Sequence, residues 1–344
     1  MNQDSAPILH PPLLVATDGS ASARMAQQLL YPIAPILAED RQNAPLISLI
    51  TVVPRFQRRS IVEAARPASE PPPSLTVAAE SIQPEHLLEV LQADLPTALT
   101  VRTAVRQGRP AVEILNYARA QQAGLIAIGH RGIGGMQELL LGSVSTVIAR
   151  YAPCSVLIAR SIETTVTAPT WDHVLLVVDK AMATQCAIRA LQQLLPAGIQ
   201  YLTAVCVQPP VSRNYLYGPL FTPTPSWQLN QSLHEVQREQ GEQLLQQVKL
   251  ALAQQSVRVE TQWHVGEAGP TLCQIAQQLQ VNVIVTGSDA SRRSLLNPLA
   301  SLRKSASSNQ SRPLLRNTRL TPTEDYLIHH APCAVLLCRQ SSMG

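Results

Sequence analysis

The sequence predicts an α/β protein of two tandem domains, each a doubly wound parallel sheet of five strands, which together form a pseudo-dimer. Three observations support this prediction: an internal duplication, continuously apolar runs of strand length, and apolar residues at helical spacing between those runs. The chain has 344 residues, of which 45% are apolar. It is therefore long enough for two domains of about 150 residues, each with its own core.

The duplication is seen in three segments of the first half that recur in the second half in the same order. The matching pairs are 13–20 with 174–181, 107–130 with 265–288, and 151–160 with 330–339. The last pair reads YAPCSVLIAR against HAPCAVLLCR. The offset grows from 158 residues in the second pair to 179 in the third, so the second half carries extra chain before its last strand.

Several predicted strands, such as LISLITVV and LIAIGH, are continuously apolar, which is typical of parallel strands covered on both faces. In the first half the strands are expected at 13–18, 46–53, 99–107, 125–130 and 155–160. Helices are expected between them, as where Val112, Leu115 and Ala118 recur at helical spacing. Pro32 and Pro35 predict that the first helix ends near Tyr31.

Composition also predicts the domain boundaries. Pro-rich or polar stretches are expected to form loops at 54–83 and 209–226, and a polar helix is expected at 228–255. The predicted domains cover 10–160 and 172–340, with a linker at 161–171.

The residues that could bind a ligand follow the predicted strand at 125–130. Gly129 ends that strand, Gly132 follows closely, and after nine intervening residues come Gly142 and Ser143, where a helix is expected to begin. Ligands of open α/β sheets bind beyond the carboxyl ends of the strands, at the point where the strand order reverses. Glycines allow close backbone approach, and the free N–H groups of a helix start attract an anion, to which Ser143 and Ser145 add hydroxyl groups.

This stretch resembles the ATP-binding branch of the universal stress protein family, whose G-x2-G-x9-G-(S/T) motif is met in full. The resemblance covers nearly the whole chain, since both halves follow the family's order of strands and helices. It implies a fold like that of the adenine-nucleotide alpha hydrolases and a bound ATP, ADP or AMP, with Mg²⁺ as part of the nucleotide complex. The implied binding residues are Thr17, Asp18, Gly19, Val52, Val53, Ile128, Gly129, His130, Arg131, Gly132, Gly142, Ser143, Val144 and Ser145.

The resemblance assigns the residues 17–19, 52–53 and 128–129 to the adenosine, and 132 and 142–145 to the phosphates. Structural alternatives stand beside these roles. Asp18 is also expected as a turn or helix-capping aspartate, and Ser143 as a simple N-cap. His130 and Arg131 either meet the phosphates or are exposed loop residues.

The second half departs from the motif. Gly132 is replaced by Ala290, and the Gly142–Ser143 pair aligns either with Thr321–Pro322 or with Ala300–Ser301. Proline lacks the amide donor that such a site needs, so the second pocket is expected to be degenerate. The insertion at 291–320 contains seven Lys and Arg residues and no acidic residue. It is read as a disordered loop, an anion or partner contact, or a phosphorylation segment. A nucleic-acid contact is the least favoured alternative, because the segment has no aromatic residue to stack on a base.

The leading functional hypothesis is a regulatory stress-response protein that binds an adenine nucleotide in its first domain. The sequence shows no convincing general base, metal cluster or nucleophile–base pair, so no catalytic residue is assigned. The alternatives are a slow ATPase or autophosphorylating enzyme, and a nucleotide-free scaffold that binds an unknown protein partner. A P-loop ATPase is excluded because the G-x4-G-K-[ST] motif is absent from the sequence.

Charge and cysteine usage limit the other classes. The net charge of +4 and the aromatic content of 3% disfavour nucleic-acid binding. The six cysteines form no CxxC motif and are expected to be small buried side chains in a reducing cytoplasm. Neither a membrane span nor a signal peptide is expected. The strands 155–160 and 334–339 are expected to pair within the chain, and a further homodimer is left open.

Overall fold

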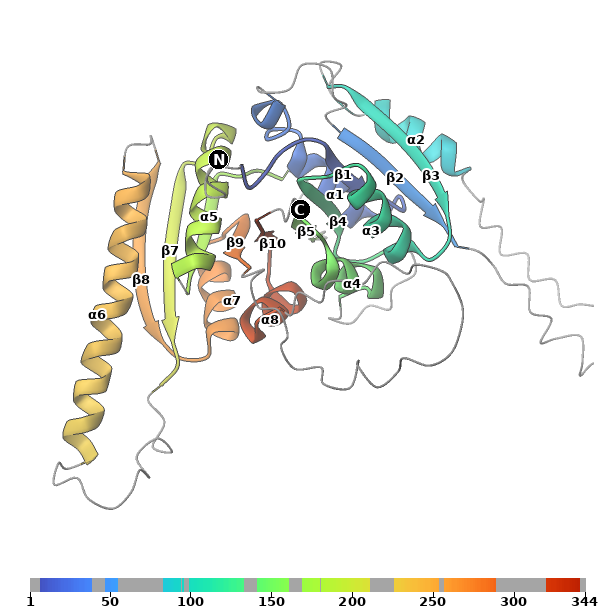
Figure 1. The fold of residues 1–344 in the computed structure, drawn as a ribbon. Helices are drawn as coiled ribbons and strands as arrows, with labels where there is room; N and C mark the ends of the chain where they lie inside the picture. Colours follow the sequence, from blue (N-terminus) through green and yellow to red (C-terminus); the bar gives the residue numbers. More distant parts are fainter. Residues whose placement is uncertain are drawn as a thin grey trace, which may run out of the picture.

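The computed structural model describes residues 7–38, 47–54, 83–93, 95, 99–132, 141–160, 169–179, 181–210, 226–253, 257–288 and 320–340. In these residues ten strands form one sheet in the order β3-β2-β1-β4-β5-β10-β9-β6-β7-β8 (Figure 1). The strands are β1 (Leu13–Ala16), β2 (Ile47–Val53), β3 (Val101–Gln107), β4 (Leu125–Gly129), β5 (Ser155–Ala159), β6 (His173–Val178), β7 (Tyr201–Gln208), β8 (Arg258–Val265), β9 (Val283–Gly287) and β10 (Ala334–Cys338).

The predicted fold class is confirmed: each half contributes five parallel strands, and the two halves have the same strand order. Among the described residues, the only antiparallel pair is β5 with β10, where Leu157 lies opposite Leu336. This is the pairing that the sequence predicts between the last strands of the two halves. It joins two five-stranded sheets into one and leaves β3 and β8 as the edges.

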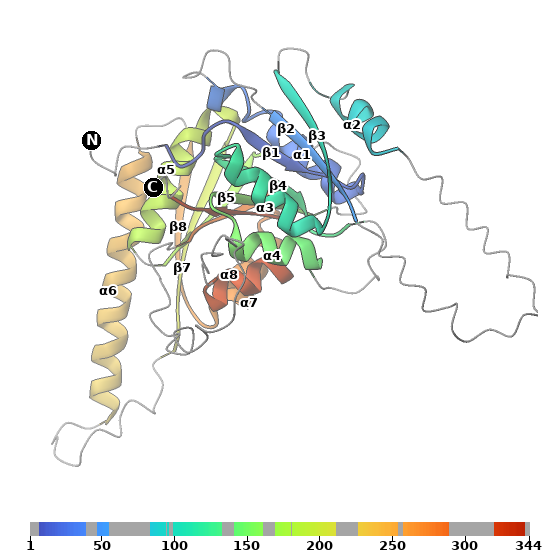
Figure 2. The same cartoon turned by 45° about the vertical axis from the view of Figure 1, so that its right-hand side comes forward.

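The helices alternate with the strands along the chain. They are α1 (Ala21–Leu30), α2 (Pro84–Ala93), α3 (Pro110–Ala120), α4 (Ser143–Tyr151), α5 (Ala181–Leu194), α6 (Ser226–Leu252), α7 (Ala268–Gln278) and α8 (Pro322–His330), with short 3₁₀ turns at Ile36–Ala38 and Leu195–Ala197. The first helix ends before Tyr31, as its two prolines predict. The polar helix predicted at 228–255 is α6. The views in Figures 1 and 2 place α4 and α8 side by side, next to the central strands.

The core consists of two aliphatic layers, one on each face of the sheet, and each layer runs through both halves. One layer receives α1, α2, α5 and α6, and the other receives α3, α4, α7 and α8. Along β1 the side chains alternate between them, with Val15 in the first layer and Leu14 in the second. Each fully buried Leu or Val contributes roughly 1.5–3 kcal/mol of transfer free energy. The inner parallel strands are therefore apolar on both faces, whereas the edge strands β3 and β8 carry exposed polar residues.

Hydrogen bonds at two further places join the first half to the second. The indole N–H of the buried Trp171 donates to the carbonyl of Leu29 at 2.9 Å. The side chain of Gln193 accepts from the amides of Ile8 and Leu9 and donates to the carbonyl of Leu9 at 3.0 Å. The halves are thus joined by helix contacts as well as by the central strands. The predicted insertions lie almost wholly outside the described residues, and Ala290 and the 291–319 segment lie fully outside them.

Candidate functional site

The carboxyl ends of β1 and β4 lie next to each other in the first half. Leu13 to Ala16 pair with Leu125 to Ile128 in parallel register. After β1 the chain passes into α1 on one face of the sheet, while α4, which follows β4 in the chain, lies on the other face. This is the point of strand-order reversal at which open α/β sheets bind ligands.

Residues 17–20 form a tight turn after β1. The Asp18 carboxylate accepts from the Ser20 amide at 3.0 Å, and the Thr17 hydroxyl accepts from the Gly19 amide at 3.2 Å. Gly19 has φ +84°, a left-handed conformation that favours glycine. Ser20, not Asp18, is the N-cap of α1, since its hydroxyl accepts from the Ala23 amide at 3.3 Å. Asp18 therefore has the turn role, and its side chain remains exposed beyond the strand.

The loop after β4 packs directly on this turn. The Arg131 carbonyl accepts hydrogen bonds from the hydroxyls of Ser20, at 3.1 Å, and Ser22. A side chain at Gly132 would overlap the Asp18 carboxylate. A Cβ atom at Gly129 would lie 2.6 Å from the Ala23 amide of α1. Gly129 is thus explained by its close approach to the backbone of α1, whereas Gly132, among the described residues, is close only to the side chain of Asp18.

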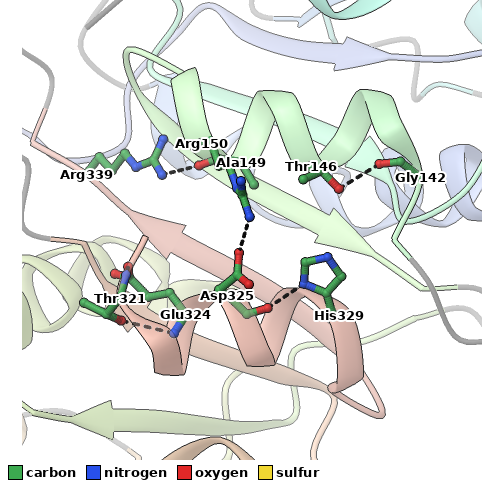
Figure 3. Close-up of polar contacts among 9 residues, drawn as sticks. All are labelled: Gly142, Thr146, Ala149, Arg150, Thr321, Glu324, Asp325, His329 and Arg339. Carbon is green, nitrogen blue, oxygen red and sulfur yellow. Dashed lines mark hydrogen bonds and ion pairs between the residues drawn. The ribbon is translucent and has the colours of Figure 1, made fainter. Parts of the chain in front are cut away.

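The third glycine begins α4. Gly142 is the N-cap and has no side chain to bond the first turn, so Ser143 is the first helical residue and the N-cap interpretation of Ser143 is wrong. The Gly142 amide donates to the His130 carbonyl at 3.0 Å, which holds the helix start against the end of β4. The Thr146 hydroxyl donates to the Gly142 carbonyl at 3.0 Å (Figure 3). The amides of the first turn of a helix have no partner within the helix, so this turn can accept an anion.

The two serines of this turn differ. Ser143 is exposed, whereas Ser145 is buried and its hydroxyl lies 3.0 Å from the carbonyls of both His130 and Gly142. The hydroxyl of Ser145 is therefore used inside the protein. Ser145, like Val144, can therefore offer a ligand only its backbone amide.

His130 is buried, with 6% of its surface exposed, so the interpretation of an exposed loop histidine is wrong. Its amide donates to the carbonyl of Ala159 at 2.7 Å. Burial, followed by the charges of Arg160, Arg131 and His329, lowers the pKa of His130 to about 3. The imidazole is therefore neutral at physiological pH and cannot offer a positive charge to a phosphate.

This low pKa predicts a pH dependence of stability. The unfolded chain takes up the proton of His130 near pH 6.5, whereas the folded chain takes it up only near pH 3, so stability is lost as the pH falls through this window. Between pH 7 and pH 5 the loss is about 2 kcal/mol. We expect His130→Ser to remove this component, because Ser288 stands at the matching position of the second half. Urea unfolding at both pH values measures the difference, and equal pH slopes for wild type and variant would contradict the assignment.

The apolar residues of the implied site are Val52, Val53 and Ile128. Val52 and Val53 end β2, the neighbour of β1, and both are partly buried. Ile128 is 6% exposed, and its side chain belongs to the core layer under α3 and α4. Only its backbone can therefore meet a ligand.

The helix start at the matching place in the second half differs from that of the first half. The helix α8 covers residues 322–330 where α4 covers 143–151, an offset of 179 residues, so Thr321 and Pro322 match Gly142 and Ser143. This decides between the two alignments that the sequence leaves open. Thr321 and Glu324 form a reciprocal capping box: the Thr321 hydroxyl accepts from the Glu324 amide at 3.1 Å, and the Glu324 carboxylate accepts from the Thr321 amide at 2.6 Å (Figure 3).

The capping box closes the start of α8 to an anion. Pro322 has no amide hydrogen, and Glu324 and Asp325 place two carboxylates in the first turn. The rest of the second half keeps the packing of the first, since a side chain at Gly287 would overlap the Ala183 carbonyl of α5. The halves therefore share a framework and differ at the helix start that follows it.

Within the part of the chain that the structure describes, no group of three or more His, Cys, Asp or Glu side chains is placed to hold a metal ion. In the same residues no helix is both long and apolar enough to cross a membrane. Of the six free cysteines, Cys154, Cys206, Cys333 and Cys338 are buried. Burial raises the pKa of Cys154 to about 12 and that of Cys273 to about 11.

Comparison with known proteins gives consistent results. The model of the universal stress protein family matches residues 11–160 and 170–339. The chain is 47% identical over 58 residues to universal stress protein YxiE of Bacillus subtilis, a match covering 17% of this chain and 39% of that protein. It is 29% identical over 154 residues to universal stress protein Rv2623 of Mycobacterium tuberculosis, covering 44% and 46%. The chain thus spans less than half the length of these curated relatives.

Two solved structures resemble the whole chain. A universal stress protein from Archaeoglobus fulgidus superimposes with a TM-score of 0.53 at 16% identity, covering 95% of this chain and 98% of the other. The functionally unknown protein PA1789 from Pseudomonas aeruginosa gives 0.54 at 16% identity, covering 96% and 92%. At this level of identity both show a common fold.

Proposed function

Because this chain belongs to the universal stress protein family, we propose that it is a regulatory stress-response protein that binds one adenine nucleotide, in its first half. The proposed binding domain covers 10–160, and the linker 161–171 connects it to a degenerate domain at 172–340. ATP, with its Mg²⁺, is the proposed ligand, with ADP and AMP as its shorter relatives.

The observation that carries the proposal is the start of α4. This helix begins at a glycine N-cap without a side-chain hydrogen bond, and the Gly142 amide donates to the His130 carbonyl. The next carbonyl, that of Arg131, accepts from Ser20 in the turn after β1. The N-terminal end of a helix carries about half a positive elementary charge, which favours an anion there. The glycines that shape this junction are the ones that the family motif requires.

The residues fit a nucleotide in two parts. The amides of Ser143, Val144 and Ser145 and the backbone of Gly132 would hold the phosphates, with the Arg131 side chain next to them. Asp18 and the ends of β1 and β2 would lie beside the adenosine. A bound nucleotide would supply the negative charge that α4 lacks. Since the proposed role is binding, no residue is assigned to hydrolysis.

The second half is proposed not to bind nucleotide. Its helix start has lost one amide donor to Pro322, and the carboxylate of Glu324 would repel a phosphate. We therefore expect one nucleotide for each chain.

The first experiment measures nucleotide released from the denatured purified protein, together with calorimetric titration of ATP. We expect about one ATP per chain, and a roughly tenfold to hundredfold weaker affinity in Ser143→Pro, which removes one amide that contacts a charged group. Proline is tolerated at the first helical position, so folding should be preserved.

Pro322→Ser is the matched control, because it alters the same position of the second half and should leave affinity and stoichiometry unchanged. Two nucleotides per chain would refute the degenerate second site. No bound nucleotide and no heat of binding would refute the proposed function and favour a nucleotide-free scaffold.

A further inference from the structure

The residue that follows β4 is hydrogen-bonded to the start of α4. The His130 carbonyl accepts from the Gly142 amide at 3.0 Å and from the Ser145 hydroxyl at 3.0 Å. Ser145 is 2% exposed, so its hydroxyl is used inside the protein at this contact. The place of the α4 start, where the phosphates are proposed to lie, is therefore tied to the backbone of His130.

The next residue along the chain is bonded to the start of α1 instead. The Arg131 carbonyl accepts from the Ser20 hydroxyl at 3.1 Å and from the Ser22 hydroxyl. The Arg131 amide in turn donates to the Ser22 hydroxyl at 3.4 Å. Since α1 directly follows the turn that contains Asp18, two consecutive carbonyls of one loop connect this turn to the start of α4.

The Ser22 side chain is enclosed between α1 and the end of β4. It is 6% exposed, and a Cβ atom at Gly129 would lie 2.5 Å from its hydroxyl oxygen. The absence of a side chain at Gly129 therefore leaves the space that this hydroxyl occupies. A buried hydroxyl costs free energy unless it is hydrogen-bonded, and here the backbone of Arg131 supplies both a donor and an acceptor.

The second half has no hydroxyl at either of these positions. At the offset of 161 residues that relates segment 13–20 to 174–181, the two serines match Ala181 and Ala183. The packing supports this match, since Gly287 lies against Ala183 as Gly129 lies against Ser22. Alanine cannot donate a hydrogen bond from its side chain. The hydroxyls that bond the loop are thus present in the half that is proposed to bind nucleotide and missing from the other.

We propose that Ser22 is a positioning residue which, together with Ser20, holds the adenosine part and the phosphate part of the nucleotide site at a fixed separation. The inference rests on the proposed function and deepens it. A ligand with two linked groups gains most affinity when both subsites are held at the separation that the ligand spans. Ser22 then acts on nucleotide binding through the backbone of Arg131, without touching the ligand.

The test compares ATP with its parts, adenosine and inorganic tripolyphosphate. Each is titrated by calorimetry into the full chain, at a temperature at which each variant is folded by circular dichroism. Ser22→Ala, which introduces the residue of the second half, should bind ATP about tenfold more weakly, because the two subsites are no longer held together. Its affinities for adenosine and for tripolyphosphate should change less than twofold, since each part occupies one subsite only.

The matched control is Ser48→Ala. Ser48 lies in β2 of the same half and is 1% exposed, and its hydroxyl has no hydrogen-bond partner among the described residues. Its removal should leave the ATP affinity unchanged. A readout without ligand follows the same two variants: hydrogen exchange of the Gly142 amide, which is bonded to the His130 carbonyl, should be at least threefold faster in Ser22→Ala than in Ser48→Ala.

Unchanged ATP affinity in a folded Ser22→Ala protein would overturn the inference, as would unchanged exchange at Gly142. An equal loss for ATP and adenosine would also overturn it, because the role of the serine is then structural only. If Ser22→Ala does not fold, Ser20→Gly takes its place, since glycine is accepted at an N-cap, and unchanged ATP affinity there overturns the inference. A wild type that binds neither ATP nor adenosine refutes the proposed function, and this inference with it.

Discussion

Grafting the helix start of α8 onto α4, by Gly142→Thr, Ser143→Pro and Ser145→Glu together, is expected to lower ATP affinity at least a hundredfold. The graft removes one amide donor, fills the first turn with a threonine hydroxyl, and adds a carboxylate where the phosphates would lie. Each lost hydrogen bond to a charged group costs roughly 1.5–3 kcal/mol, and about 2.7 kcal/mol corresponds to a hundredfold change. Calorimetric titration and nucleotide content measure the result.

The grafted protein should still fold, because the second half shows that the same four-residue pattern caps a helix of the same length at the same junction. The far-ultraviolet circular dichroism spectrum and a cooperative melt check this. The control is Thr323→Val, which matches Val144 but leaves the capping box intact, and which should have no effect on ATP. Retained nanomolar or micromolar binding in a folded graft, equal to that of the wild type, would show that the start of α4 is not the phosphate site.

The second large effect concerns the framework. Gly287→Ala is expected to destabilise the protein by about 3 kcal/mol or more, because its methyl group would overlap the backbone carbonyl of Ala183 rather than a movable side chain. Relief requires α5 to move away from β9, which would open packing in the core layer that contains Leu191 and Val285. Chemical unfolding measures the free energy.

Gly198→Ala provides the matched comparison. Gly198 has φ +96° and no atom within 4 Å of an added Cβ atom, so only the left-handed backbone is penalised, at about 1 kcal/mol. Equal losses in the two variants would show that the close approach of α5 to β9 carries no cost. A much larger loss at Gly287 would support the same explanation for Gly129, whose added Cβ atom would also collide with a helix backbone.

The sequence predicts the framework well because the framework depends on local and repeated signals. Apolar runs locate the strands within one or two residues at most ends, and Pro32 and Pro35 locate the end of α1. The pairing of β5 with β10 follows from the duplication, since each half ends in the same apolar strand. These features need no knowledge of distant side chains.

The site is predicted less completely, for physical reasons that differ between residues. The capping box had a readable signal, because Thr321, Pro322 and Glu324 follow the pattern of a capped helix with proline at its first position. The low pKa of His130 had none, since it depends on its burial and on the charges of Arg160, Arg131 and His329, the last of which lies in α8 of the other half. Arg160 and Arg339 could be recognised in the sequence only as the same residue at the end of both repeats. The partner of Arg339 is the Ala149 carbonyl of α4, which lies 190 residues away in sequence (Figure 3).

Fusion of the halves into one chain removes a constraint that a dimer of identical subunits must obey. In such a dimer every contact across the two-fold axis occurs twice, so a harmful change is doubled and a useful asymmetric contact is unavailable. Here Arg150 pairs with Asp325 at 2.8 Å, while the counterpart positions hold His329 and Thr146. The covalent link also keeps the partner present at any dilution. The two halves are thereby free to diverge, as the starts of α4 and α8 do.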